Sequence, residues 1–103
     1  MKNEPTRLAP ASAGQLRSAR RLLRRKERLA RGEFLAEGPQ AVREALAADR
    51  PPQLVLITER AAEGHADLVS RAAASGVRCS MITDQELATV TDATTPQGIV
   101  AIC

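Results

Sequence analysis

Aromatic side chains are almost absent from this sequence, which contains no Trp, no Tyr and a single Phe, Phe34. Proteins that read single strands of nucleic acid stack several bases on aromatic rings, so this mode of binding is not expected. Cysteine is nearly as rare, because Cys79 and Cys103 are too few for a disulfide framework or a four-ligand zinc site. We expect both to be small buried hydrophobic residues in a reducing, cytoplasmic environment. No apolar run approaches the ~18 residues of a membrane span and no secretory signal is recognisable, so neither is expected.

Residues that perform catalysis are also scarce. The one histidine, His65, lies at the predicted start of a helix and has no partners that support a catalytic triad. The six glycines are scattered and form neither a GxGxxG loop nor a Walker loop. We therefore expect no catalytic, cofactor-binding or metal-binding residue here, and no enzymatic activity of this chain by itself.

Positive charge is concentrated at one end of the chain. Residues 1–31 hold ten basic and two acidic side chains, a net charge of +8, whereas residues 32–103 hold five basic and ten acidic ones, a net charge of −5. A basic front on an acidic body indicates a polyanion-facing segment attached to an ordinary domain.

A basic amphipathic helix is predicted over residues 14–31, after a lead-in over residues 1–13 that we expect to be flexible. Its apolar residues recur at spacings of three and four and form one face: Leu16, Ala19, Leu22, Leu23, Leu29 and Ala30. Seven arginines project from the opposite face: Arg17, Arg20, Arg21, Arg24, Arg25, Arg28 and Arg31. Of these, Arg17, Arg21, Arg24 and Arg28 fall at the centre of the face and Arg25 nearer its edge. Lys26 falls in the apolar stripe, and Gly32 is well placed to end the helix.

These arginines point to nucleic acid. Guanidinium groups bind phosphate oxygens in pairs, and the release of counterions supplies much of the affinity. Glu27 is the only acidic residue within the helix, so most of the arginines lack a partner one turn away. This imbalance favours contact with RNA over the alternative, a solvated face paired with the acidic body.

Short strands and helices alternate in the rest of the domain. Strands are predicted over residues 33–37, 53–58, 77–82 and 98–102, and helices over residues 39–48, 65–74 and 83–90. Crossovers of a dozen or more residues join parallel strands. We therefore expect one domain over residues 14–103, with an α/β body over residues 33–103 that is a three-layer α/β/α sandwich with a mainly parallel sheet. The chain stops inside its last strand, so we expect a piece of a longer protein cut at a domain boundary.

A second candidate site lies where the first strand runs into the helix that begins at Pro39. Free backbone N–H groups at such a place suit a phosphate or a polar base edge. Glu33 and Glu37 make the neighbourhood negative, so we expect Glu37 to position an arginine of the basic helix. A glycine cap at Gly38 on a tight turn is the alternative. Glu37 and Gly38 join the seven arginines as candidate RNA-binding residues.

Several segments resemble the opening of SpoU-family RNA methyltransferases, which are also called TrmH-like and belong to the SPOUT superfamily. They are residues 24–28 (RRKER), residues 32–39 (GEFLAEGP), similar to a strand of the form Phe-Leu-Val-Glu-Gly, and residues 42–46 (VREAL). Residues 95–101 (TPQGIVA) are similar to the Thr-Pro-Gln-Gly segment that closes the same N-terminal domain. The resemblance spans residues 16–103, and Ala36 stands where a valine is usual.

The resemblance implies an RNA-substrate-binding domain similar in fold to kink-turn-binding ribosomal proteins. It also implies a following knotted SPOUT domain that binds S-adenosylmethionine, forms a homodimer and methylates a ribose 2′-hydroxyl of structured RNA, ribosomal or transfer. That domain would lie after residue 103, so no catalytic or cofactor residue is carried over to this chain.

Two other functions stay open at this point. One is a stand-alone RNA-binding module of the ribosomal-protein type without enzymatic activity. The other is a small α/β enzyme that clamps an acidic metabolite with arginines, which is disfavoured because a clamp needs a few arginines converging in a pocket.

Overall fold

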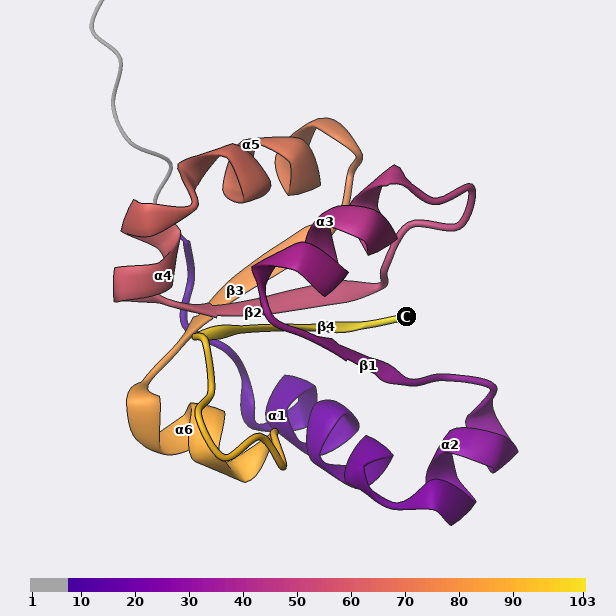
Figure 1. Ribbon diagram of the computed structural model, residues 1–103. Coiled ribbons are helices and arrows are strands. Elements are labelled where there is room, and N and C mark those ends of the chain that lie inside the picture. Colours follow the sequence, from indigo (N-terminus) through magenta and orange to yellow (C-terminus); the bar gives the residue numbers. More distant parts are fainter. Residues whose placement is uncertain (1–7) are drawn as a thin grey trace, which may run out of the picture.

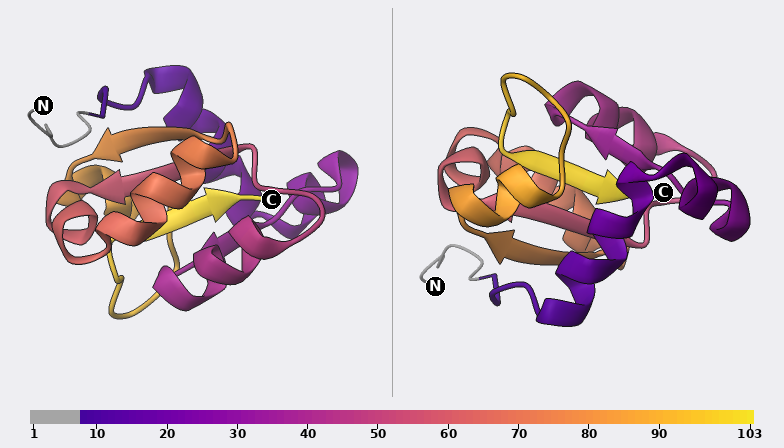
Figure 2. Two further views of the ribbon diagram at one scale, coloured as in Figure 1. Left: turned by 90° about the horizontal axis from the view of Figure 1, so that it is seen from above. Right: turned by 90° about the horizontal axis from the view of Figure 1, so that it is seen from below.

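A four-stranded sheet lies between two layers of helices in the computed structural model, which describes residues 8–103 (Figure 1, Figure 2). The strands are β1 (Leu35–Glu37), β2 (Leu54–Thr58), β3 (Arg78–Ile82) and β4 (Ile99–Ile102). The α-helices are α1 (Ala13–Arg20), α2 (Arg25–Arg31), α3 (Pro39–Ala47), α4 (Glu59–Gly64), α5 (Ala66–Ala74) and α6 (Asp84–Thr89), with a 3-10 turn η1 (Arg21–Leu23) after α1. The α/β fold with helices on both faces of the sheet is as predicted, although the sequence pattern does not predict α4.

The sheet is mixed, so the prediction of a mainly parallel sheet is wrong. Its order is β1-β4-β2-β3, and only β2 and β3 pair in parallel, because β4 is antiparallel to both of its neighbours. The strands β1, β2 and β3 still point the same way, as their helical crossovers require. After α6 the chain re-enters the sheet at the edge where β3 ends, beside Thr58, and β4 runs backwards.

Each face of the sheet has its own hydrophobic core. On one face α3, α4 and α5 cover Val55, Ile57 and Ile99, and on the other α1 and α6 cover Leu54, Leu56 and Val100 (Figure 1). Every residue of β2 is buried, which explains why its sequence is an uninterrupted apolar run rather than an alternating one.

The single basic helix predicted over residues 14–31 is wrong in one respect, because the segment breaks at Arg24. Arg24 has an extended backbone (φ −95°, ψ 129°) and separates η1 from α2. No residue of α2 is buried, and α2 projects beyond the end of the sheet (Figure 1, Figure 2). Leu29, predicted to face the core, is 69% exposed, and Lys26 is exposed as well rather than lying along the core edge. Gly32 ends α2 in the left-handed conformation, as predicted.

The described part of the predicted lead-in is held against the outer strand of the sheet. The backbone N–H of Ala11 donates to the carbonyl of Met81, and the N–H of Met81 donates to the carbonyl of Ala9, both over 2.8 Å. Ser12 then caps α1 in a reciprocal pair of hydrogen bonds with Gln15. This ordering differs from the expected flexibility of residues 8–13, while residues 1–7 lie outside the described residues. Within residues 8–103, no helix has the length and apolar character needed to cross a membrane.

Candidate nucleic-acid interface

Four of the seven predicted arginines surround one shallow hollow on α1 and η1. Arg17, Arg20, Arg21 and Arg24 line this arginine hollow together with Leu23, and its volume is about 330 Å³. The break at Arg24 does not scatter them, because η1 continues the turn of α1 before the chain changes direction. The hollow therefore brings four arginines together, and no acidic residue lies on its lining.

Two arginines of the hollow are oriented by hydroxyl groups. Nη2 of Arg20 donates to Oγ1 of Thr89 over 3.2 Å, and Nη2 of Arg21 donates to Oγ of Ser18 over 3.1 Å. Neither contact neutralises the charge, because hydroxyl acceptors are uncharged. Each guanidinium keeps further N–H donors for an incoming phosphate.

The three arginines of α2 behave differently from one another. Arg28 is half-buried, and its Nη1 donates to the carbonyl oxygens of Leu22 and Leu23, both over 3.0 Å. It thus provides a hydrogen-bond donor to the last carbonyl groups of η1. Arg31 pairs with Glu27 over 3.0 Å, and this hydrogen bond lowers the pKa of Glu27 below its usual value. Arg25 is exposed. The arginine row predicted on one helical face is thus divided between a hollow, a structural contact and an ion pair.

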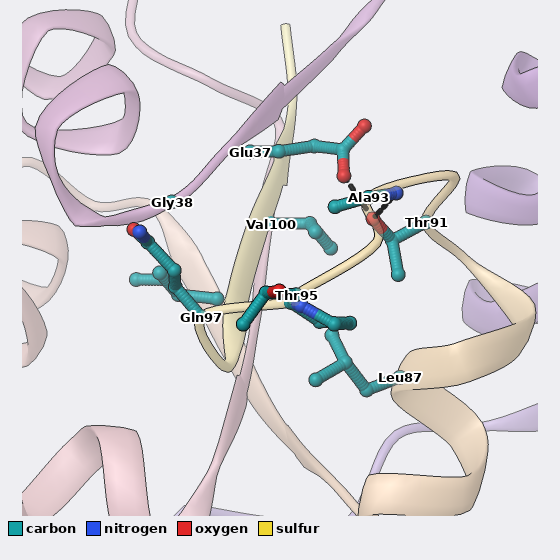
Figure 3. A pocket seen from close by; sticks show the side chains of 10 residues that line it. Glu37, Gly38, Leu87, Thr91, Ala93, Thr95, Gln97 and Val100 are labelled. Atoms are coloured by element: carbon teal, nitrogen blue, oxygen red, sulfur yellow. Dashed lines mark hydrogen bonds between the residues drawn. The ribbon is translucent and has the colours of Figure 1, made fainter.

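Glu37 and Gly38 lie at a small pocket between the segments 32–39 and 95–101. The pocket has a volume of about 200 Å³ and is lined by Glu37, Gly38, Thr91 and Gln97, among others (Figure 3). Gly38 has φ +92° and lies so near Gln97 that a Cβ at position 38 would come within 2.8 Å of its Oε1. The segments 32–39 and 95–101, far apart in the sequence, therefore meet at Gly38, where the positive φ favours glycine.

The structure gives Glu37 a partner other than the expected arginine. Its carboxylate accepts a hydrogen bond from the Thr91 hydroxyl, which in turn accepts one from the backbone N–H of Ala93 over 3.0 Å (Figure 3). The role predicted for Glu37, positioning an arginine of the basic helix, is therefore wrong. Glu37 instead anchors the loop after α6. The sequence does not single out Thr91, because it lies four residues before the segment 95–101 and belongs to no motif. Gln97, in contrast, lies within that segment.

The cysteines are unsuited to nucleophilic chemistry. Cys79 and Cys103 are free and half-buried, less enclosed than predicted. Burial raises the pKa of the Cys79 thiol to about 11 and also raises the pKa of Cys103. Residues 8–103 contain no group of three or more His, Cys, Asp or Glu residues that could hold a metal ion.

Comparison with protein families finds a match over most of the chain. The family described as MRM3-like substrate binding domain matches residues 14–101. A search of curated proteins finds no match.

Solved structures with the same fold come from methyltransferases. An rRNA methyltransferase from Sinorhizobium meliloti superposes with a TM-score of 0.70 and 21% identity, over 88% of this chain and 33% of that one. A putative RNA methyltransferase of the TrmH family from Porphyromonas gingivalis gives a TM-score of 0.64 and 25% identity, over 91% and 35%. A structure described as an RNA 2′-O ribose methyltransferase gives 0.65 and 23%, over 94% and 36%. The chain therefore spans about a third of the length of these proteins.

Proposed function

Because this chain belongs to the MRM3-like substrate binding domain family, we propose that it binds the RNA substrate of an S-adenosylmethionine-dependent 2′-O-ribose methyltransferase. The resemblance to the SpoU or TrmH-like family is confirmed by the family match and by the solved structures. We propose ribosomal RNA as the substrate class, in keeping with the rRNA methyltransferase from Sinorhizobium meliloti that shares the fold.

The arginine hollow is the observation that carries this proposal. Four arginines around one hollow can offer their guanidinium groups to phosphate oxygens at its rim, since each guanidinium can donate two parallel hydrogen bonds. The shallow shape suits an RNA backbone lying across α1 and η1 better than it suits an enclosed metabolite. Contacts of this kind position an RNA without reading its sequence. Selection of the target nucleotide then falls to other contacts, among which we propose the Glu37–Gly38 pocket.

Neither of the two candidate sites described above suits the cofactor. The Glu37–Gly38 pocket, of about 200 Å³, is smaller than the roughly 300–1,000 Å³ of ordinary ligand sites. The arginine hollow would repel the positively charged sulfonium of S-adenosylmethionine. One relative was solved with the cofactor bound, and this chain covers 34% of it. We propose that cofactor binding, methyl transfer and dimerisation belong to a further domain of a longer protein, which acts in the cytoplasm.

RNA binding by the chain tests the proposal. Binding of a fluorescein-labelled RNA hairpin is measured by anisotropy at several salt concentrations. If the four arginines of the hollow each hold a phosphate, log K should fall against log salt with a slope of about −2.8 to −3.6, at about 0.7–0.9 per contact. The double variant Arg20→Gln/Arg24→Gln should bind more weakly and have a slope shallower by about 1.4–1.8.

A matched control uses the other side of the molecule. Arg60 and Arg71 are exposed and lie on α4 and α5, across the sheet from the hollow. Changing both to Gln removes the same charge as the double variant in the hollow. This control should bind RNA like the wild type. Equal weakening in both double variants would mean that net charge, not the hollow, determines binding. A wild-type chain that binds no RNA at low salt would overturn the proposal.

A further inference from the structure

A second cavity with arginines on its lining lies between α1 and the edge of the sheet where β2 and β3 begin. This α1 groove has a volume of about 820 Å³. Arg17 and Arg21 line it from α1 and η1, Arg78 lines it from the first position of β3, and Leu54 and Ile102 form its apolar floor. Arg78 is far from the basic segment in the sequence, so the chain pattern by itself does not connect them.

Strand register explains how Arg78 reaches this groove. In the sheet Arg78 lies directly beside Leu54, which in turn lies beside Ile102. Leu54 and Ile102 belong to the core that α1 covers, and neighbours in register project from the same face of a sheet. Arg78 therefore lies on the α1 side of the sheet, at its border, where its side chain is exposed.

The three arginines of the groove have no counter-charge in the part of the chain that the structure describes. No acidic residue lines the groove, and the ion pairs formed within residues 8–103 are Glu27 with Arg31 and Asp67 with Arg43. Nε of Arg21 is buried and has no hydrogen-bond partner among the same residues. Like charges held around one cavity repel each other, so an anion in the groove would relieve this repulsion.

We propose that the α1 groove is a binding site for backbone phosphate of RNA, held by Arg17, Arg21 and Arg78. The inference rests on the proposed RNA-binding function and extends it. Arg17 and Arg21 line both the groove and the arginine hollow, so the two cavities form one continuous basic path from η1 to the start of β3. The RNA backbone would follow this path, with phosphates at the arginines of the hollow and a neighbouring phosphate at Arg78.

Arg78 separates this inference from the proposed function, because it lines the groove and not the hollow. The variant Arg78→Gln removes one charge at an exposed position, and Arg71→Gln removes one from α5 on the opposite face. With the labelled RNA hairpin, Arg78→Gln should weaken binding at low salt and make the salt slope shallower by about 0.7–0.9, the contribution of one phosphate contact. Arg71→Gln should leave both quantities unchanged.

A second measurement shows where an anion binds. Titration of the 15N-labelled chain with inorganic pyrophosphate should shift the amide signals of Arg17, Leu54 and Arg78 in a saturable way, and Arg78→Gln should abolish the shift.

If the wild type binds RNA but Arg78→Gln binds like Arg71→Gln, the groove is not part of the RNA site and the proposed function stands. Saturable pyrophosphate binding with that same RNA result would assign the groove to a small anionic ligand and equally overturn the inference. If the wild type binds no RNA, the proposed function and the inference fall together.

Discussion

Replacing Arg28 with alanine should destabilise the folded chain, although its position in the sequence pattern assigns it to a solvent-facing row of arginines. The structure shows that Nη1 of Arg28 donates to the carbonyl oxygens of Leu22 and Leu23, each over 3.0 Å. These carbonyls end η1 just before the break at Arg24 and are not taken up by a continuing helix. Arg28 thus fastens α2 to the end of η1.

The size of the effect follows from the two hydrogen bonds that are lost. A hydrogen bond to a charged group contributes about 1.5–3 kcal/mol when it is well buried. Arg28 is only half-buried, so water can replace part of each contact in the variant. We expect a loss of about 1–3 kcal/mol in the free energy of unfolding. Because 1 kcal/mol shifts Tm by about 4–8 °C in domains of 60–100 residues, the change is measurable.

Urea denaturation of Arg28→Ala and Arg25→Ala, followed by circular dichroism, is the assay. Both variants lose one arginine from α2 and gain the same alanine, but Arg25 is exposed. Removing a cation from the first turn of a helix is neutral or slightly stabilising, so the control should unfold at or just above the wild-type midpoint. Equal midpoints for Arg28→Ala and Arg25→Ala would refute the reasoning and return Arg28 to the solvent-facing row.

Three further outcomes can be measured on the same chain. Leu22→Ala should lower the free energy of unfolding by about 2–5 kcal/mol, because Leu22 is 1% exposed in the α1-side core; a loss below 1 kcal/mol would contradict its place there. Gly98→Ala should lower the urea midpoint more than the exposed substitution Arg25→Ala, because φ is +87° and the new Cβ would lie 2.8 Å from both Ala61 Cβ and Thr58 Oγ1. Alkylation of Cys79 by iodoacetamide in the native chain, located by mass spectrometry, should stay slow at pH 8 and accelerate towards pH 11, since burial raises its pKa to about 11 and keeps the thiolate scarce. Rapid labelling at pH 8 would show that the thiol is not so buried.

Helix ends could be predicted from the sequence where all the capping residues lie within one short segment. The helix predicted over residues 83–90 is present, capped by Thr83 and Glu86, and Gly38 with Pro39 opens α3. These features depend on backbone geometry within three or four residues, so neighbours elsewhere in the fold do not change them.

The break at Arg24 illustrates a limit of periodicity. Residues 20–31 are good helix formers, and nothing in their spacing marks an interruption. The break is accompanied by a contact from Arg28 back to Leu22 and Leu23, five and six residues away, which no propensity describes. The same break moves Leu29 out of the core and leaves it 69% exposed.

By itself, the sequence determined the chemistry of this protein's surface: a basic segment, an acidic body, a near absence of aromatic rings, and two motifs typical of one family. Tertiary structure alone decided which charges act together. The direction of β4 is set by its pairing between β1 and β2, and the α1 groove depends on strand register, which brings Arg78 to the same cavity as Arg17 and Arg21. The physical reason is that composition and spacing report on neighbours along the chain, whereas a binding site is made by residues that only folding brings together.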